Sequence, residues 1–139
     1  PQTDYGHAKL AMEQAIAQYP HVTSLRIANV MGCDTLAAAM QRGPVTLDQF
    51  TDGRGPRRMF ITPTALAYVI CALSAHPDPL PAVINVAQPE LVAMQAVLTA
   101  AGATWHWRPA PADALASLEM DVTLLLQYAP DLAPWRVLS

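Results

Sequence analysis

A tyrosine and a lysine near the start of the chain have the spacing of a proton-transfer pair. Tyr5 and Lys9 lie four residues apart in the segment TDYGHAKLAMEQAI, residues 3–16, so on a helix their side chains share one face. A tyrosine ionises with a pKa of about 10 and is a poor base at neutral pH, but a nearby ammonium favours its phenolate form. Such a pair can exchange a proton with a substrate hydroxyl or carbonyl. An ordinary surface pair at a helix start has the same spacing, so both interpretations stay open on spacing alone.

The elements that must position this pair alternate between helices and strands. Apolar spacing, capping residues, prolines and glycines predict helices at residues 5–18, 34–43, 63–75, 89–102 and 121–130. The same signals predict strands at residues 22–32, 45–47, 58–62, 82–87 and 104–109. Alternation of this kind indicates an α/β architecture. Only residues 22–30 and 82–87 read as fully buried strands. We therefore expect the back half of a larger domain together with a small α+β cap.

Composition indicates a folded protein with a buried core and argues against some classes of partner. The 139 residues are enough for one domain, with 53% hydrophobic and 14% charged residues. The net charge is −3 and the basic residues are scattered, which argues against a nucleic-acid partner. No apolar run is long enough to predict a membrane span, and no segment resembles a signal peptide. Cys33 and Cys71 lack metal-binding spacing, so we expect buried, reduced thiols, no metal site and a cytoplasmic location.

Four segments of the chain, in order, are YGHAKLAMEQ (residues 5–14), LRIANVMG (residues 25–32), GPRRMFITPTALA (residues 55–67) and VINVAQPELVAMQAVLTAAG (residues 83–102). Together they resemble the extended short-chain dehydrogenase/reductases, which include the NAD-dependent epimerases and dehydratases. In that family a YGxSKxxxE motif opens a long helix, and the next strand reads LRxxNVYGP; the first two segments resemble these motifs. The third segment resembles the family segment GxxxRDFIHVDDLA, and the fourth resembles the family's YNVG strand and following helix. Thr64 and Ala65 depart from the family pattern, which has aspartates there.

The resemblance implies a fold class and a division of the chain. It implies a C-terminal fragment of an NAD(P)-binding Rossmann-like fold with a small α+β substrate cap and without the N-terminal βαβ nucleotide-binding half. The implied parts are residues 1–32 (the last catalytic helix and strand), 33–62 (a cap segment), 63–88 (a helix and strand returning to the sheet) and 89–139 (the C-terminal substrate cap).

Two family features that belong upstream of the tyrosine are not found in this sequence. They are the glycine-rich dinucleotide fingerprint, which holds the pyrophosphate at a helix N-terminus, and the catalytic serine or threonine. The chain also begins at Pro1 and enters a predicted helix almost at once. We therefore expect that further sequence precedes Pro1 and that the chain alone is inactive.

The resemblance also assigns site residues. Tyr5 would be the catalytic acid/base, and Lys9 would favour its phenolate and bind the nicotinamide ribose. Asn29 and Val30 would contact the cofactor, and Asn29 and Arg58 would contact the substrate, with Arg58 on a phosphate. A loop hydrogen bond for Asn29 and a solvated side chain for Arg58 remain alternatives.

The implied activity is that of an NAD- or NADP-dependent oxidoreductase, epimerase or dehydratase. It would act on a hydroxyl or carbonyl carbon, with a sugar-like substrate among the candidates, and a homodimer would form through the helix that begins at Tyr5. Two alternatives stay open. One is a non-catalytic dinucleotide-sensing or scaffold relative, and the other is a small α/β interaction domain.

Overall fold

The computed structural model describes residues 3–134, so the expectation about Pro1 lies outside the described residues. Its strands form three small sheets. The first pairs β1 (Ser24–Ile27) with β5 (Val83–Val86), and the second pairs β3 (Val45–Gln49) with β7 (Trp105–Pro109). In the third, β4 (Arg57–Ile61) pairs with β2 (Asn29–Val30), β6 (Leu91–Ala93) and β8 (Ser117–Leu118). All of these pairings are parallel except that of β4 with β6. The predicted α/β architecture is confirmed.

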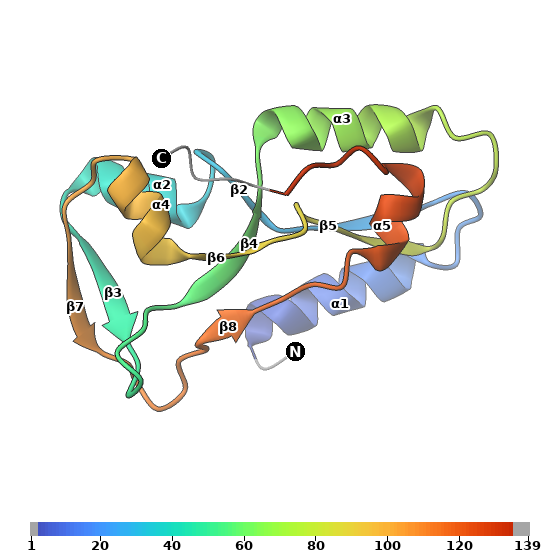
Figure 1. The fold of residues 1–139 in the computed structure, drawn as a ribbon. Helices are drawn as coiled ribbons and strands as arrows, with labels where there is room; N and C mark the ends of the chain where they lie inside the picture. The colour runs from blue at the N-terminus through green and yellow to red at the C-terminus, as the bar shows by residue number, and fades with distance from the viewer. Residues whose placement is uncertain (1–2, 135–139) are drawn as a thin grey trace.

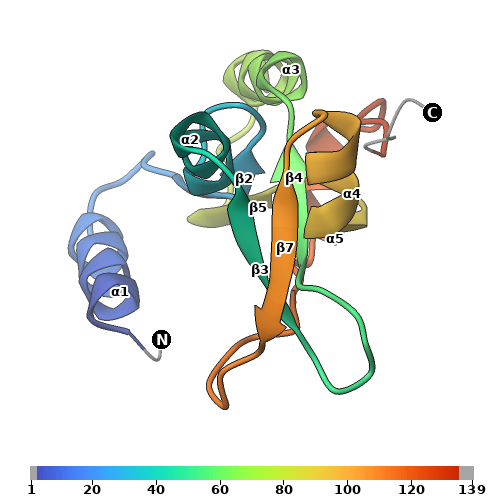
Figure 2. The same cartoon turned by 90° about the vertical axis from the view of Figure 1, so that its left-hand side faces the viewer.

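The helices cover these sheets from several sides, and they are α1 (Asp4–Ile16), α2 (Thr35–Arg42), α3 (Pro63–Ser74), α4 (Met94–Ala100) and α5 (Thr123–Tyr128). Helices α1 and α3 lie on opposite sides of the layer that contains β5 (Figure 1). Helix α1 stands apart from the rest of the molecule (Figure 2). In residues 3–134, none of the helices combines the length and the apolar character needed to cross a membrane.

Side-chain caps explain where three helices begin. Thr3, Asp34 and Thr62 precede α1, α2 and α3, and each side chain accepts a hydrogen bond from a main-chain N–H three residues later. Pro63 occupies the first turn of α3, where the missing N–H costs no hydrogen bond. Gly43 ends α2 with φ of 130°, a conformation that a side chain would strain. These signals are local and can be read from the sequence. The predicted helices that correspond to α1, α2 and α3 are therefore confirmed to within about two residues at each end.

Two apolar clusters hold the fold together. The first lies between α3, β5 and α5, where Val69, Ile84 and Leu125 are fully buried. The second lies under α2 and α4, where Phe60 and Leu98 are fully buried beside the β3–β7 sheet. Strand β4 contributes to both clusters because its side chains alternate between its two faces.

The predicted helix at residues 89–102 is wrong in its first half. Leu91–Ala93 form β6, and only Met94–Ala100 are helical. The antiparallel pairing of β6 with β4 explains the difference, because it uses Val92 as a buried strand residue opposite Arg58. The short strand β8 was not predicted either. The last helix, α5, is shorter than the predicted residues 121–130.

The expectation of a fully buried strand at residues 22–30 is also wrong. The segment breaks at Ala28 into β1 and β2, and Ile27 at the end of β1 is 44% exposed. Within residues 3–134, β1 pairs with β5 alone, so one of its edges is uncovered.

The two cysteines also differ from the expectation that they are buried. Cys33 lies in the turn before α2 and Cys71 on the outer face of α3, and both are free and exposed.

Candidate functional site

Tyr5 and Lys9 lie on one face of α1 at its first two turns. The Lys9 Nζ atom is 5.6 Å from the centroid of the Tyr5 ring, a cation–π distance. Tyr5 is 73% exposed, and no residue of α1 is buried. Neither polar group hydrogen bonds to another residue within the described part of the chain. Both are therefore free to contact a ligand.

The pair lines a groove between α1 and β1. The groove has a volume of about 560 Å³, and apolar side chains of α1, among them Met12 and Ile16, form part of its wall. An ion pair joins the helix to the strand, since Arg26 Nη2 and Nε donate to Glu13 Oε1 and Oε2 at 2.6 Å and 2.8 Å. This bidentate hydrogen bond lowers the pKa of Glu13 from its ordinary value and raises that of Arg26.

The uncovered edge of β1 faces this groove. The N–H groups of Ser24 and Ala28 donate to main-chain oxygens of the segment that contains β5, at 2.8 Å and 2.9 Å. Alternate residues of a parallel strand direct their main-chain groups to opposite sides, so those of Leu25 and Ile27 point away from β5. A second groove of about 160 Å³ lies under α3 and shares Leu25 with the first. The edge is thus flanked by a groove on each face of the strand.

Asn29 and Val30 form the short strand β2, beyond the break at Ala28. They pair with Phe60 and Ile61 of β4, and both are half-buried. Residues in register on neighbouring strands project to the same face. Asn29 is therefore on the face of Phe60, and so is Arg58, two residues earlier on β4.

Arg58 is anchored at the start of β4. Its Nη1 donates to the main-chain oxygen of Arg57 at 2.7 Å and its Nη2 to that of Leu115 at 3.0 Å. Partial burial lowers the pKa of the Arg58 guanidinium, and the negative charge of Asp48 opposes this effect. The same Asp48 accepts a 2.6 Å hydrogen bond from Arg108 Nε. Asp48 is therefore ion-paired with Arg108, and its charge also acts on Arg58.

Sequence reasoning did not predict the pairing of Arg108 with Asp48. The pairing of Asp48 with Arg108 depends on the register between β3 and β7, which are about sixty residues apart in the chain. A visible signal was the alternation in residues 104–109, which places His106 and Arg108 on the face opposite the two tryptophans. Trp105 and Trp107 pack on the second apolar cluster instead.

The predicted residues form two groups. Tyr5 and Lys9 lie on the α1–β1 groove, and Asn29, Val30 and Arg58 lie on β2 and β4. No hydrogen bond or ion pair in residues 3–134 joins the two groups. Their assigned roles therefore stay predictions.

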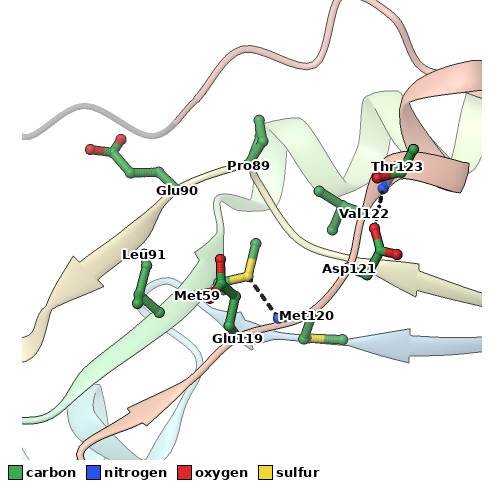
Figure 3. A pocket seen from close by; sticks show the side chains of 9 residues that line it. All are labelled: Met59, Pro89, Glu90, Leu91, Glu119, Met120, Asp121, Val122 and Thr123. Atoms are coloured by element: carbon green, nitrogen blue, oxygen red, sulfur yellow. Dashed lines mark hydrogen bonds between the residues drawn. The ribbon is translucent and has the colours of Figure 1, made fainter.

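A further cavity contains none of these residues. It has a volume of about 440 Å³ and lies between β4, β6 and the segment that leads into α5 (Figure 3). Glu90, Glu119 and Asp121 supply its carboxylates, and hydrogen bonds from Thr123 lower the pKa of Asp121. The described residues hold no cluster of metal-ligating groups.

Comparison with known proteins gives structural neighbours but no sequence relatives. No protein-family model matches the chain, and no curated protein matches it. Three solved structures illustrate the likeness. UDP-glucose 4-epimerase from Stenotrophomonas maltophila, with NAD and formylated UDP-arabinopyranose, has a TM-score of 0.73 and 17% identity, over 98% of this chain and 52% of its own. TunA, an NAD-dependent NDP-hexosamine 5,6-dehydratase involved in tunicamycin biosynthesis, has a TM-score of 0.68 and 20% identity, over 92% and 48%.

The third is the Bordetella bronchiseptica enzyme WbmG in complex with NAD and UDP. Its TM-score is 0.67 and its identity 22%, over 92% of this chain and 43% of its own. The chain thus spans about half the length of these neighbours. Its fold is the α/β arrangement found in that half of the NAD-dependent epimerases and dehydratases.

Proposed function

We propose that the chain supplies the substrate-binding half of a nicotinamide-dependent epimerase or dehydratase that acts on a sugar nucleotide. The observation that carries the proposal is the Tyr5–Lys9 pair, exposed on the α1–β1 groove of a fold shared with such enzymes. Two of the neighbouring structures hold NAD together with a UDP-sugar or with UDP, which supports a sugar nucleotide as the substrate class. We assign the enzyme to the cytoplasm, in keeping with its two free cysteines.

Tyr5 would exchange a proton with the reacting hydroxyl or carbonyl of the sugar. The ammonium of Lys9 would stabilise the phenolate of Tyr5 and bind the ribose next to the nicotinamide. Bound NAD or NADP supplies hydride transfer. The exposed Lys9 and Tyr5 head groups fit the nicotinamide end of such a cofactor. The glycine-rich turn that would hold the pyrophosphate is not found in this sequence, so a separate nucleotide-binding half would hold that end.

The free edge of β1 is where we propose that this nucleotide-binding half docks. A strand added in parallel would pair with the outward main-chain groups of Leu25 and Ile27. The docked half would also cover the grooves beneath α1 and α3. In this arrangement the cofactor would lie beside Tyr5 and Lys9.

Asn29 and Val30 would contact the cofactor. Asn29 would also contact the sugar, and Arg58 would bind a phosphate of the substrate. Arg58 is suited to this task because its guanidinium is already partly desolvated and fixed by two main-chain oxygens. Arg108 forms an ion pair with Asp48, which offsets the negative charge that acts on Arg58. The small exposed side chains of α1 that do not line the groove, such as Ala8 and Ala15, would form a homodimer contact.

Substitution of Tyr5 by Phe tests the proposal in the assembled enzyme, with both halves present. We expect turnover of a UDP-sugar to fall about 10²- to 10⁴-fold, the usual contribution of a general acid/base. Cofactor binding, measured by calorimetry, should change little because the hydroxyl is lost but the ring and Lys9 remain. Tyr19→Phe is the matched control. Tyr19 is also exposed, at 60%, but lies beyond the end of α1 and should leave turnover unchanged.

The contrary result would favour a non-catalytic role. If no UDP-sugar is turned over and Tyr5→Phe leaves every measured property unchanged, the pair has no acid/base function. A binding or sensing protein would then fit better, in keeping with Thr64 and Ala65 at positions where the resembled family has aspartates.

A further inference from the structure

A basic cavity at the loop that leads into β4 lies outside the site described above. It has a volume of about 370 Å³ and is lined by Arg54, Gly55, Arg57, Ala93 and Gln95. None of these residues has a role in the proposed reaction.

The two arginines that line the cavity have unused hydrogen-bond donors. The Arg54 side chain makes no hydrogen bond or ion pair with any residue between 3 and 134. Arg57 donates one Nη2 hydrogen bond, at 3.0 Å, to the main-chain oxygen of Leu91. The nearby Asp52 carboxylate accepts from the main-chain N–H of Arg54 at 2.9 Å rather than from its guanidinium. The cavity thus carries two guanidinium charges that no described carboxylate pairs with.

The third polar group of the cavity is the amide of Gln95. Its Oε1 atom is buried and accepts no hydrogen bond from the described residues. The amide is tightly packed, because a Cβ on Gly55 would lie 2.6 Å from this Oε1 and 2.8 Å from the Trp107 ring. The close approach of the Gly55 main chain fixes the loop between the two arginines. The Gln95 N–H groups are also without a partner in this part of the chain.

We propose that this cavity binds the phosphate group of a small molecule. Two guanidinium groups match the double negative charge of a phosphate, and an amide N–H can donate to a third oxygen. The cavity volume exceeds that of a single phosphate ion, so a phosphorylated organic ligand would fit. The site is separate from Arg58, because Arg57 and Arg58 project to opposite faces of β4.

Calorimetric titration of the 139-residue chain with pyrophosphate, at constant ionic strength, tests the proposal. We expect saturable binding that Arg54→Gln weakens about tenfold or more, the usual cost of losing a hydrogen bond to a charged group. The Arg54 side chain is exposed and makes no hydrogen bond or ion pair in residues 3–134, so this variant should fold normally, as circular dichroism would check. Arg42→Gln, which removes the same charge from the last turn of α2, is the matched control and should leave binding unchanged.

The mapping experiment is an NMR titration of the same chain. Pyrophosphate should shift the amide signals of Gly55 and the side-chain amide of Gln95. The proposal is overturned if binding is not saturable, if Arg54→Gln and Arg42→Gln weaken it equally, or if the shifts map to Arg58 and Arg108 instead. A tricarboxylate such as citrate that binds as tightly as pyrophosphate would overturn the choice of phosphate.

Discussion

At the scale of single residues, the chain exposes its most reactive groups. Tyr5 and Lys9 contact one another across one turn of α1 and leave their polar ends open. Arg58, by contrast, is half-buried, and two main-chain oxygens hold its guanidinium in place. Residue type and spacing selected Tyr5 and Lys9 as candidates, and the family resemblance selected Arg58. Whether a side chain is exposed or anchored depends on segments far away in sequence, and for that reason the pairing of Arg108 with Asp48 was not predicted.

Gly55 offers a prediction about packing at this scale. Gly55→Ala should lower the free energy of unfolding by about 1–3 kcal/mol, because its Cβ would overlap Gln95 Oε1 and the Trp107 ring. Denaturant unfolding measures the change. The double variant Gly55→Ala with Gln95→Ala should recover part of the loss, since one of the two overlapping groups is gone. Equal stability of Gly55→Ala and the parent chain would show that the loop has room to move.

At the scale of elements, helix α1 is the least integrated part of the structure. It is 13 residues long and buries none of them, and an isolated helix of this length is marginal in water. The Arg26–Glu13 ion pair links it to β1. The signals that predicted α1, α2 and α3, which are capping residues for the first two and Pro63 for the third, are local and can be read from the sequence. Strand β6 was mistaken for helix because its conformation depends on pairing with β4.

The ion pair predicts a pH dependence for α1. Because the folded state lowers the pKa of Glu13, the contribution of this pair is complete above the ordinary glutamate value of about 4.5 and is lost as the pH falls through the lowered value. Protection of α1 amides from hydrogen exchange, corrected for intrinsic rates, should therefore be constant from pH 7 to about pH 5 and fall at more acid pH.

Glu13→Gln is the control for this pH dependence. In this variant the α1 amides should be less protected from hydrogen exchange at neutral pH. Their protection should show no further loss attributable to this pair as the pH falls, while the amides of β5 stay protected in both proteins. If Glu13→Gln loses α1 protection over the same acid range as the parent chain, another carboxylate is responsible.

At the scale of the whole molecule, the free edge of β1 is the feature that should govern association with other chains. An uncovered strand edge with an apolar residue beside it is prone to pair with another chain. We expect this 139-residue chain to self-associate at high concentration, and Ile27→Lys to reduce the association by placing a charge at the edge. Sedimentation velocity measures the effect. Leu115→Lys is the matched control, because Leu115 is 49% exposed against 44% for Ile27 but lies in a loop away from β1. Equal association of all three proteins would place the contact elsewhere.

The sequence alone sufficed for the α/β class, the starts of three helices and the placement of Tyr5 and Lys9 on one face of a helix. These features depend on residues within a few positions of one another, where spacing carries the physical information. The exposure of Cys33 and Cys71, the break at Ala28 and the conformation of β6 required the folded chain. So did the ion pair of Arg108 with Asp48 and the cavity at Arg54 and Arg57. Each of these depends on which distant segments pair and in what register, and local propensity does not encode that.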